Sequence, residues 1–125
     1  MKHILIKTIL HKKQAYKTVG DYRMTPKSFQ ITVSKMDNDD YEFLVGLHEM
    51  VEQYLCYKEH IFDDVITKFD KVFEAKRKKG NTDEPGNDPK CPYGKQHLAA
   101  TKIEQIMAKN LGVSWKKYEE AINSL

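Results

Sequence analysis

The spacing of apolar residues changes once along the chain, and this change limits the folds that the sequence can adopt. Residues 3–10 are rich in β-branched residues, and in residues 28–34 apolar and polar residues alternate with a period of two. Both features are typical of β-strands. A further strand is expected around residues 18–23. Beyond the acidic segment 37–40, apolar residues recur every three or four positions, as in amphipathic helices. The sequence therefore predicts an α+β fold, with a small N-terminal antiparallel sheet followed by a layer of three to four helices.

The helical part divides into four segments separated by recognisable breaks. Helices are expected over residues 41–57, 62–78 and 93–110, and Ser114 is placed to cap a short last helix over 115–125. Segment 80–92 is rich in proline and glycine and forms the one long irregular loop. A length of 125 residues fits a single domain, 1–125. The apolar residues expected to face the interior are Leu44, Leu47, Val51 and Leu55 on the first helix, and Leu98, Ile103, Ile106 and Met107 on the third.

Composition excludes several classes of function. The net charge is +3, too small a bias to indicate nucleic-acid binding, although it leaves room for a small anionic ligand. No apolar run approaches the roughly 18 residues of a membrane span, and no signal peptide is visible, so a soluble cytoplasmic protein is expected. Cys56 and Cys91 lack a CxxC spacing and are expected as free thiols, Cys56 in the core and Cys91 in the loop.

One turn of the first helix carries the residues best suited to chemistry. His48 and Glu52 are four positions apart, so they lie on one face of the helix and can share a ligand. Imidazole nitrogens and carboxylate oxygens both bind first-row metal ions such as zinc. Glu49 follows His48 directly, which is the position of the general base in HExxH zinc hydrolases. Because position 52 is Glu, this HExxE motif departs from that signature.

A catalytic zinc site usually has three protein ligands, so a third must come from elsewhere in the chain. His97, near the start of the third helix, is the best candidate, and Glu104 lies on the same face seven residues later. Asp88 in the long loop offers another oxygen ligand. The sequence thus predicts a metal site formed by His48, Glu52 and His97, with Asp88 as an additional ligand and Glu49 as the catalytic base.

Two other interpretations of the same residues stay open. His48 and Glu52 could be a structural pair at the edge of the helix, with Glu52 held by a lysine or tyrosine. They could also belong to a ligand-binding site that contains no metal.

The order of short motifs along the chain resembles that of small proteins encoded by bacteriophages and prophages, whose helix motif usually reads HELVE. The positions that carry the resemblance are Gln14-x-Tyr16-x-Thr18-x-Gly20-Asp21-Tyr22, Tyr41-Glu42, His48-Glu49-Met50-Val51-Glu52, Phe69-Asp70, residues 83–89 (DEPGNDP), Pro92-Tyr93 and His97. The resemblance implies a phage protein in the bacterial cytoplasm whose polar motif positions are His48, Glu49, Glu52, Asp70, Asp88 and His97. The chain departs from the family pattern at Met50, where leucine is usual, and at Cys91, which adds a thiol to the loop.

Two functions follow as hypotheses. The first is a zincin-like, metal-dependent hydrolase. The second is a phage anti-defence protein, of a kind that is often oligomeric, that sequesters a nucleotide signal or binds a host protein without catalysis. In the second, basic residues around the loop, such as Lys90 and Lys95, would hold the anionic ligand.

Overall fold

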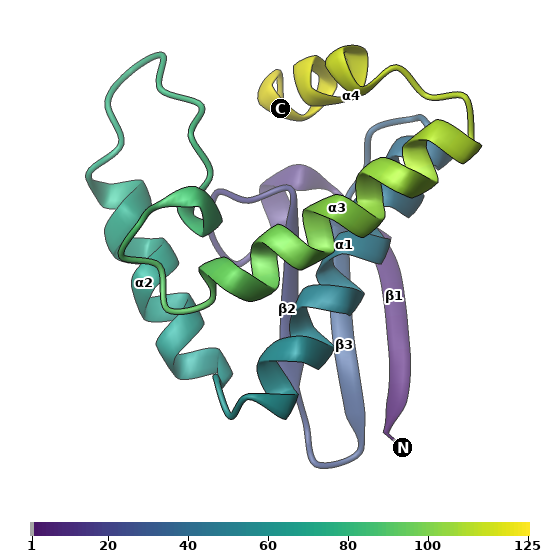
Figure 1. The fold of residues 1–125 in the computed structure, drawn as a ribbon. Helices are drawn as coiled ribbons and strands as arrows, with labels where there is room; N and C mark the ends of the chain where they lie inside the picture. The colour runs from purple at the N-terminus through teal and green to yellow at the C-terminus, as the bar shows by residue number, and fades with distance from the viewer. Residues whose placement is uncertain (1) are drawn as a thin grey trace.

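The computed structural model describes residues 2–125 and places a three-stranded sheet beside four α-helices (Figure 1). The strands are β1 (His3–Ile9), β2 (Gly20–Met24) and β3 (Ser28–Ser34), arranged in the order β1-β3-β2. The helices α1 (Asp39–Lys58), α2 (Asp63–Ala75), α3 (Gly94–Asn110) and α4 (Trp115–Asn123) follow the sheet in the chain. The α+β class expected from the sequence is confirmed.

The sheet is mixed, whereas the sequence had suggested an antiparallel one. β2 and β3 form an antiparallel hairpin, but β1 pairs with β3 in parallel, from His3 opposite Ser28 to Ile9 opposite Ser34. The connection between β1 and β2 is long enough to cross two strand spacings, and it leaves the central position to β3, the most buried strand. Gln14 in this connection accepts a hydrogen bond from Thr32 of β3 at 2.9 Å, which fixes the crossover against the central strand.

Helix α1 covers the inner face of the sheet. Phe29, Ile31 and Val33 of β3 are almost fully buried, and Leu44 and Val45 of α1 are buried with them. The helix begins where the acidic segment predicts: the Asn38 side chain accepts the Tyr41 N–H at 3.1 Å, and acidic residues occupy the first turn. The expected helix over 41–57 is confirmed and extends slightly at both ends.

Helix α3 runs along α1 on the side away from the sheet, and a loop with one short helical turn, η2 (Pro85–Asn87), joins α2 to α3 (Figure 1). Helix α2 ends at Ala75, earlier than expected, because Arg77 turns back to bind Glu74 and the carbonyl oxygens of Asn81 and Asp83. The Ser114 hydroxyl caps α4, as predicted.

The inward faces of α1 and α3 differ from those that apolar periodicity predicts. Leu98, Ile103 and Ile106 of α3 are 53%, 42% and 64% exposed. The buried residues of α3 are instead Gln96, His97, Ala100, Glu104 and Ala108. On α1, His48 and Glu52 are buried, whereas Leu47, Val51 and Leu55 are only half-buried. The two helices therefore meet through polar side chains.

Within residues 2–125, none of the helices has the length and apolar character that crossing a membrane would require.

Candidate metal centre

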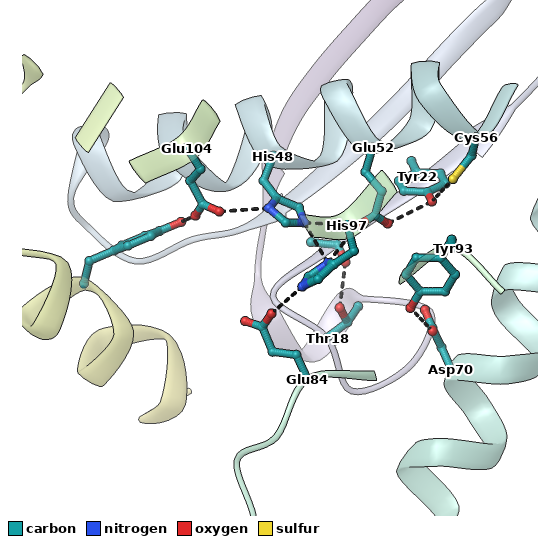
Figure 2. A network of polar contacts seen from close by, with 12 residues as sticks. Thr18, Tyr22, His48, Glu52, Cys56, Asp70, Glu84, Tyr93, His97 and Glu104 are labelled. Atoms are coloured by element: carbon teal, nitrogen blue, oxygen red, sulfur yellow. Dashed lines mark hydrogen bonds and ion pairs between the residues drawn. The ribbon is translucent and has the colours of Figure 1, made fainter. Parts of the chain in front are cut away.

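Three potential ligand atoms from α1 and α3 converge on one point (Figure 2). His48 Nε2 lies 3.0 Å from Glu52 Oε2, and His97 Nδ1 lies 2.9 Å from the same oxygen. The two ring nitrogens are 3.2 Å apart. One turn of α1 places His48 and Glu52 side by side, and the contact between α1 and α3 brings in His97.

These separations suit a single metal ion. Two ligands about 2.0–2.1 Å from a tetrahedral ion lie about 3.3–3.4 Å apart, and octahedral neighbours at that bond length lie about 2.9 Å apart. The three measured separations fall close to this range, so one ion above the triangle could contact all three atoms with small side-chain movements. The buried group of His48, Glu52 and His97 could therefore hold a metal ion.

Each histidine turns its other ring nitrogen to a second carboxylate. His48 Nδ1 lies 2.8 Å from Glu104 Oε1. His97 Nε2 lies 2.9 Å from Glu84 Oε2, although the angle there is too poor for a hydrogen bond. Metal-binding histidines usually donate the other ring N–H to a carboxylate, a backbone carbonyl or a water, which fixes the tautomer and the ring orientation. Both histidines are thus oriented with the ligating nitrogen toward Glu52.

Tyrosines hold two of the carboxylates in place. The Tyr22 hydroxyl donates to Glu52 Oε1 at 2.9 Å, which leaves Oε2 for the histidines. The Tyr118 hydroxyl of α4 donates to Glu104 Oε2, while Oε1 faces His48. Strand β2 and helix α4 therefore support the site through these two tyrosines, and the polar faces of α1 and α3 are explained by it.

Gly86 allows the loop to approach His97 closely. A Cβ atom at position 86 would lie 2.2 Å from Cγ of the His97 ring, so only glycine fits there without displacing the ring or the loop. The loop therefore passes next to the site and places Glu84 beside Nε2 of the His97 ring, whereas Nδ1 of the same ring faces Glu52.

Burial and charge shift the pKa values of the group in a consistent way. Burial disfavours charge on His48, but the hydrogen bonds to Glu104 and Glu52 outweigh it and raise the His48 pKa well above its usual value. Burial likewise disfavours charge on His97, but the hydrogen bond to Glu52 and the nearby Glu84 carboxylate outweigh it and raise the His97 pKa to about 9. Burial raises the pKa of Glu52, yet the two histidines reverse that effect and lower the Glu52 pKa overall. In the metal-free protein the surrounding carboxylates thus favour the protonated form of both histidines.

A cavity of about 230 Å³ adjoins the group. It is lined by the three candidate ligands, by Glu49, by loop residues 81–86 and by α4. Burial and the nearby Glu52 charge raise the Glu49 pKa well above its usual value. A metal ion bound here would have three protein ligands and an open side, which is the arrangement of catalytic sites rather than structural ones.

The structure brings together most of the residues predicted from sequence. His48, Glu52 and His97 form the group, and Glu49 lines the cavity with its side chain packed on Gly20. Asp88 is not brought to the group: it is half-buried, its carboxylate accepts the Lys90 N–H at 2.8 Å, and it lies outside the cavity lining. Glu84, from the same loop, lies against His97 instead.

Other residues noted from the sequence fall around this centre. Asp70 is buried in the cavity wall and accepts hydrogen bonds from the hydroxyls of Tyr16, at 2.8 Å, and Tyr93. Cys56 is a buried free thiol, as predicted, and Cys91 is a free thiol packed against the apolar core.

Sequence reasoning assigned no role at the site to Glu84, Tyr22, Tyr118 and Gly86. Tyr22, Glu84 and Gly86 lie within the motifs that carry the family resemblance, and a tyrosine partner for Glu52 was one of the open interpretations, whereas Tyr118 left no signal. Glu104 had been noted only by its spacing from His97.

Comparisons with family models, with curated proteins and with solved structures found no match to the chain. The functional argument therefore rests on the geometry of the site.

Proposed function

We propose that the chain is a metal-dependent hydrolase that binds zinc through His48, Glu52 and His97. The observation that carries the proposal is the pair of outer carboxylates, because Glu104 and Glu84 face the non-ligating nitrogens of both histidines. A structural pair at a helix edge needs neither of them. A hydrogen-bonded pair, His48 with Glu104, and an ion pair, His97 with Glu84, leave the other nitrogen of each ring pointing at one shared oxygen, and this arrangement favours a metal site.

Glu49 favours hydrolysis over other metal chemistry. Two histidines and one carboxylate are the ligand set both of zinc hydrolases and of iron(II) oxygenases, so the ligands alone do not choose between them. Glu49 adds a carboxyl group on the cavity wall, directly after a ligand in the chain. A carboxyl group at that place can assist hydrolysis by accepting a proton from the attacking water.

In the proposed reaction, zinc would supply a water of lowered pKa and polarise the substrate carbonyl. As the water oxygen bonds to the carbonyl carbon, Glu49 accepts a proton from that water. Glu49 then gives that proton to the leaving group as the bond between the carbonyl carbon and that group breaks.

Zinc titration of metal-free protein tests the site. We expect one zinc ion per chain and a higher melting temperature in its presence. His97→Ala and Glu52→Gln should lose the tight binding while circular dichroism shows a folded chain. His3→Ala, which removes an exposed histidine of β1, should bind zinc like the wild type. Wild-type protein that takes up no zinc, with no change in melting temperature, would end the proposal.

Glu49→Gln tests the catalytic step separately. With p-nitrophenyl acetate as the probe, zinc-loaded wild type should hydrolyse the ester faster than metal-free protein. Glu49→Gln should keep its zinc and lose about 10²-fold or more in rate, which is the usual contribution of a general base. Equal rates in the two zinc-loaded proteins would assign Glu49 a different role.

A further inference from the structure

Negative charge is concentrated in the cavity beside the candidate metal centre. Eight of the chain's eighteen Asp and Glu side chains line this cavity, but only two of its twenty-one Lys and Arg side chains do, namely Lys17 and Arg77. The chain as a whole is positive, at +3. The cavity therefore has the opposite charge to the rest of the protein.

Most of these carboxylates have a partner, but some do not. Glu52, Glu84 and Glu104 face the two histidines, and Glu74 binds Arg77 through two hydrogen bonds of 2.8 Å. Asp21 contacts Arg23 at 3.0 Å. Within residues 2–125, Glu49, Asp70 and Asp83 have no ion pair.

A bound zinc ion would not remove this excess. It would displace one proton from each histidine as it binds. The two positive charges of the ion would therefore replace those of the two protons, and the net charge of the site would stay the same. The carboxyl groups beyond the ligands would still outnumber the lysine and arginine side chains that line the cavity.

Asp70 shows most clearly the shortage of positive charge. It is 7% exposed, and its two oxygens receive only neutral tyrosine hydroxyls, from Tyr93 and Tyr16. Burial raises the Asp70 pKa to about 6, and the nearby Glu52 and Asp21 charges add to the shift. A cation placed beside Asp70 would compensate for the cost of burying this carboxylate.

A phosphate or other anionic group is poorly suited to this cavity. Lys17 is the one lysine or arginine in the lining that is not already bound to a carboxylate. An anion would face the unpaired carboxylates at short range in a partly enclosed site, where charges interact more strongly than in water. The small anionic ligand that the net charge allowed is thus disfavoured at this cavity.

We propose that the substrate of this site carries a positive charge, a primary ammonium or a guanidinium, bound toward Asp70 while its carbonyl group reaches the metal. This inference rests on the proposed function, since it assigns a substrate class to that site. A volume of about 230 Å³ is below the range of drug-sized pockets, so the recognised part is small, about the size of one side chain and its acyl group.

Three hydroxamates, which chelate zinc, test the substrate class. Nα-acetyl-lysine hydroxamate carries a side-chain cation, the norleucine analogue is close in length and neutral, and the glutamate analogue is anionic. Their dissociation constants are measured by calorimetry on zinc-loaded wild-type protein. The lysine compound should bind at least ten-fold more tightly than the norleucine compound, the glutamate compound should be the weakest, and salt should reduce the difference.

Two variants test whether Asp70 and Asp83 recognise the positive charge of the substrate. Asp70→Asn keeps the size of the side chain and should reduce the preference for lysine over norleucine several-fold, and Asp83→Asn, on the exposed loop, should reduce it less. Glu59→Gln removes an exposed carboxylate outside the cavity and should leave the preference unchanged.

The outcomes separate this inference from the proposed function. If zinc binds and all three hydroxamates bind equally, or the anionic one binds best, the substrate class is wrong and the metal site stands. A lysine preference that both Asp70→Asn and Asp83→Asn leave unchanged would also overturn it. If zinc itself does not bind, both proposals fail.

Discussion

Glu104 of α3 lies 2.8 Å from Nδ1 of His48 on α1, and this contact turns Nε2 of the same ring toward Glu52 and His97. A residue from one helix thus sets the orientation of a candidate ligand on another. Tyr118 of α4 fixes Glu104 in turn, so the orientation of His48 depends on a chain of contacts across three helices.

Glu104→Gln should weaken zinc binding about ten-fold or more, because a neutral amide orients and polarises the His48 ring less well than a carboxylate. Competition with a chelator of known affinity measures the change. Glu119→Gln, which alters an exposed carboxylate of α4, is the control and should bind zinc normally. Unchanged affinity in Glu104→Gln would show that His48 does not depend on this partner.

Gly86→Ala should destabilise the protein by about 1–3 kcal/mol, as overpacking does, and should also weaken zinc binding. The added Cβ would meet Cγ of the His97 ring at 2.2 Å, so the ring or the loop must move. Gly94→Ala is a matched control, since the nearest atom to its Cβ is 3.5 Å away, an ordinary contact. Urea unfolding and zinc titration of both variants should separate them, and equal behaviour would contradict the tight fit at position 86.

Asp70 should make the metal-free protein less stable as the pH rises from about 4 to 7. Its pKa is raised from 3.8 to about 6 by burial, so the folded state holds a proton over a range in which the unfolded state has lost it. Stability therefore falls as the pH passes through this range, by up to about 3 kcal/mol for a shift of about two pH units.

Urea unfolding of wild type and Asp70→Asn at pH 4 and at pH 7 measures this loss of stability. The wild type should lose stability relative to Asp70→Asn, which has no carboxylate to ionise. A difference between the two proteins that stays constant from pH 4 to pH 7 would show that Asp70 titrates normally.

Zinc binding should release protons and strengthen with pH. In the metal-free protein the carboxylate partners raise the pKa of both histidines, that of His97 to about 9. Because zinc must displace a proton from each ring, its apparent affinity should rise steeply, by up to about 100-fold per pH unit, between pH 6 and pH 8. Calorimetry in buffers of different ionisation enthalpy counts the protons released, and a value near zero at pH 7 would mean that the rings are already neutral.

Much of the site could be predicted because its two ligands on α1 are set by local geometry. A helix places residues four apart on one face, so the pairing of His48 with Glu52 follows from the sequence alone. His97 was predictable as the histidine on another expected helix.

The rest depends on tertiary packing that periodicity does not encode. Assigning apolar residues to the interior fails for Ile103 and Ile106, because α3 buries the residues of a polar site instead. Which carboxylate of the loop reaches the site depends on local turns, so Asp88 was expected and Glu84 lies there. The parallel pairing of β1 depends on the long crossover, which shows no pattern of its own.

The division of the candidate ligands between α1 and α3 also bears on how long the folded state would last. His48 and His97 are 49 residues apart in the chain, so an ion that binds both would act as a reversible cross-link between distant segments. Separating the two helices would require the ion to leave at least one ring. Because a released ion could rebind before the helices separate, the lifetime of the loaded protein would depend on the free metal concentration around it as well as on its own packing.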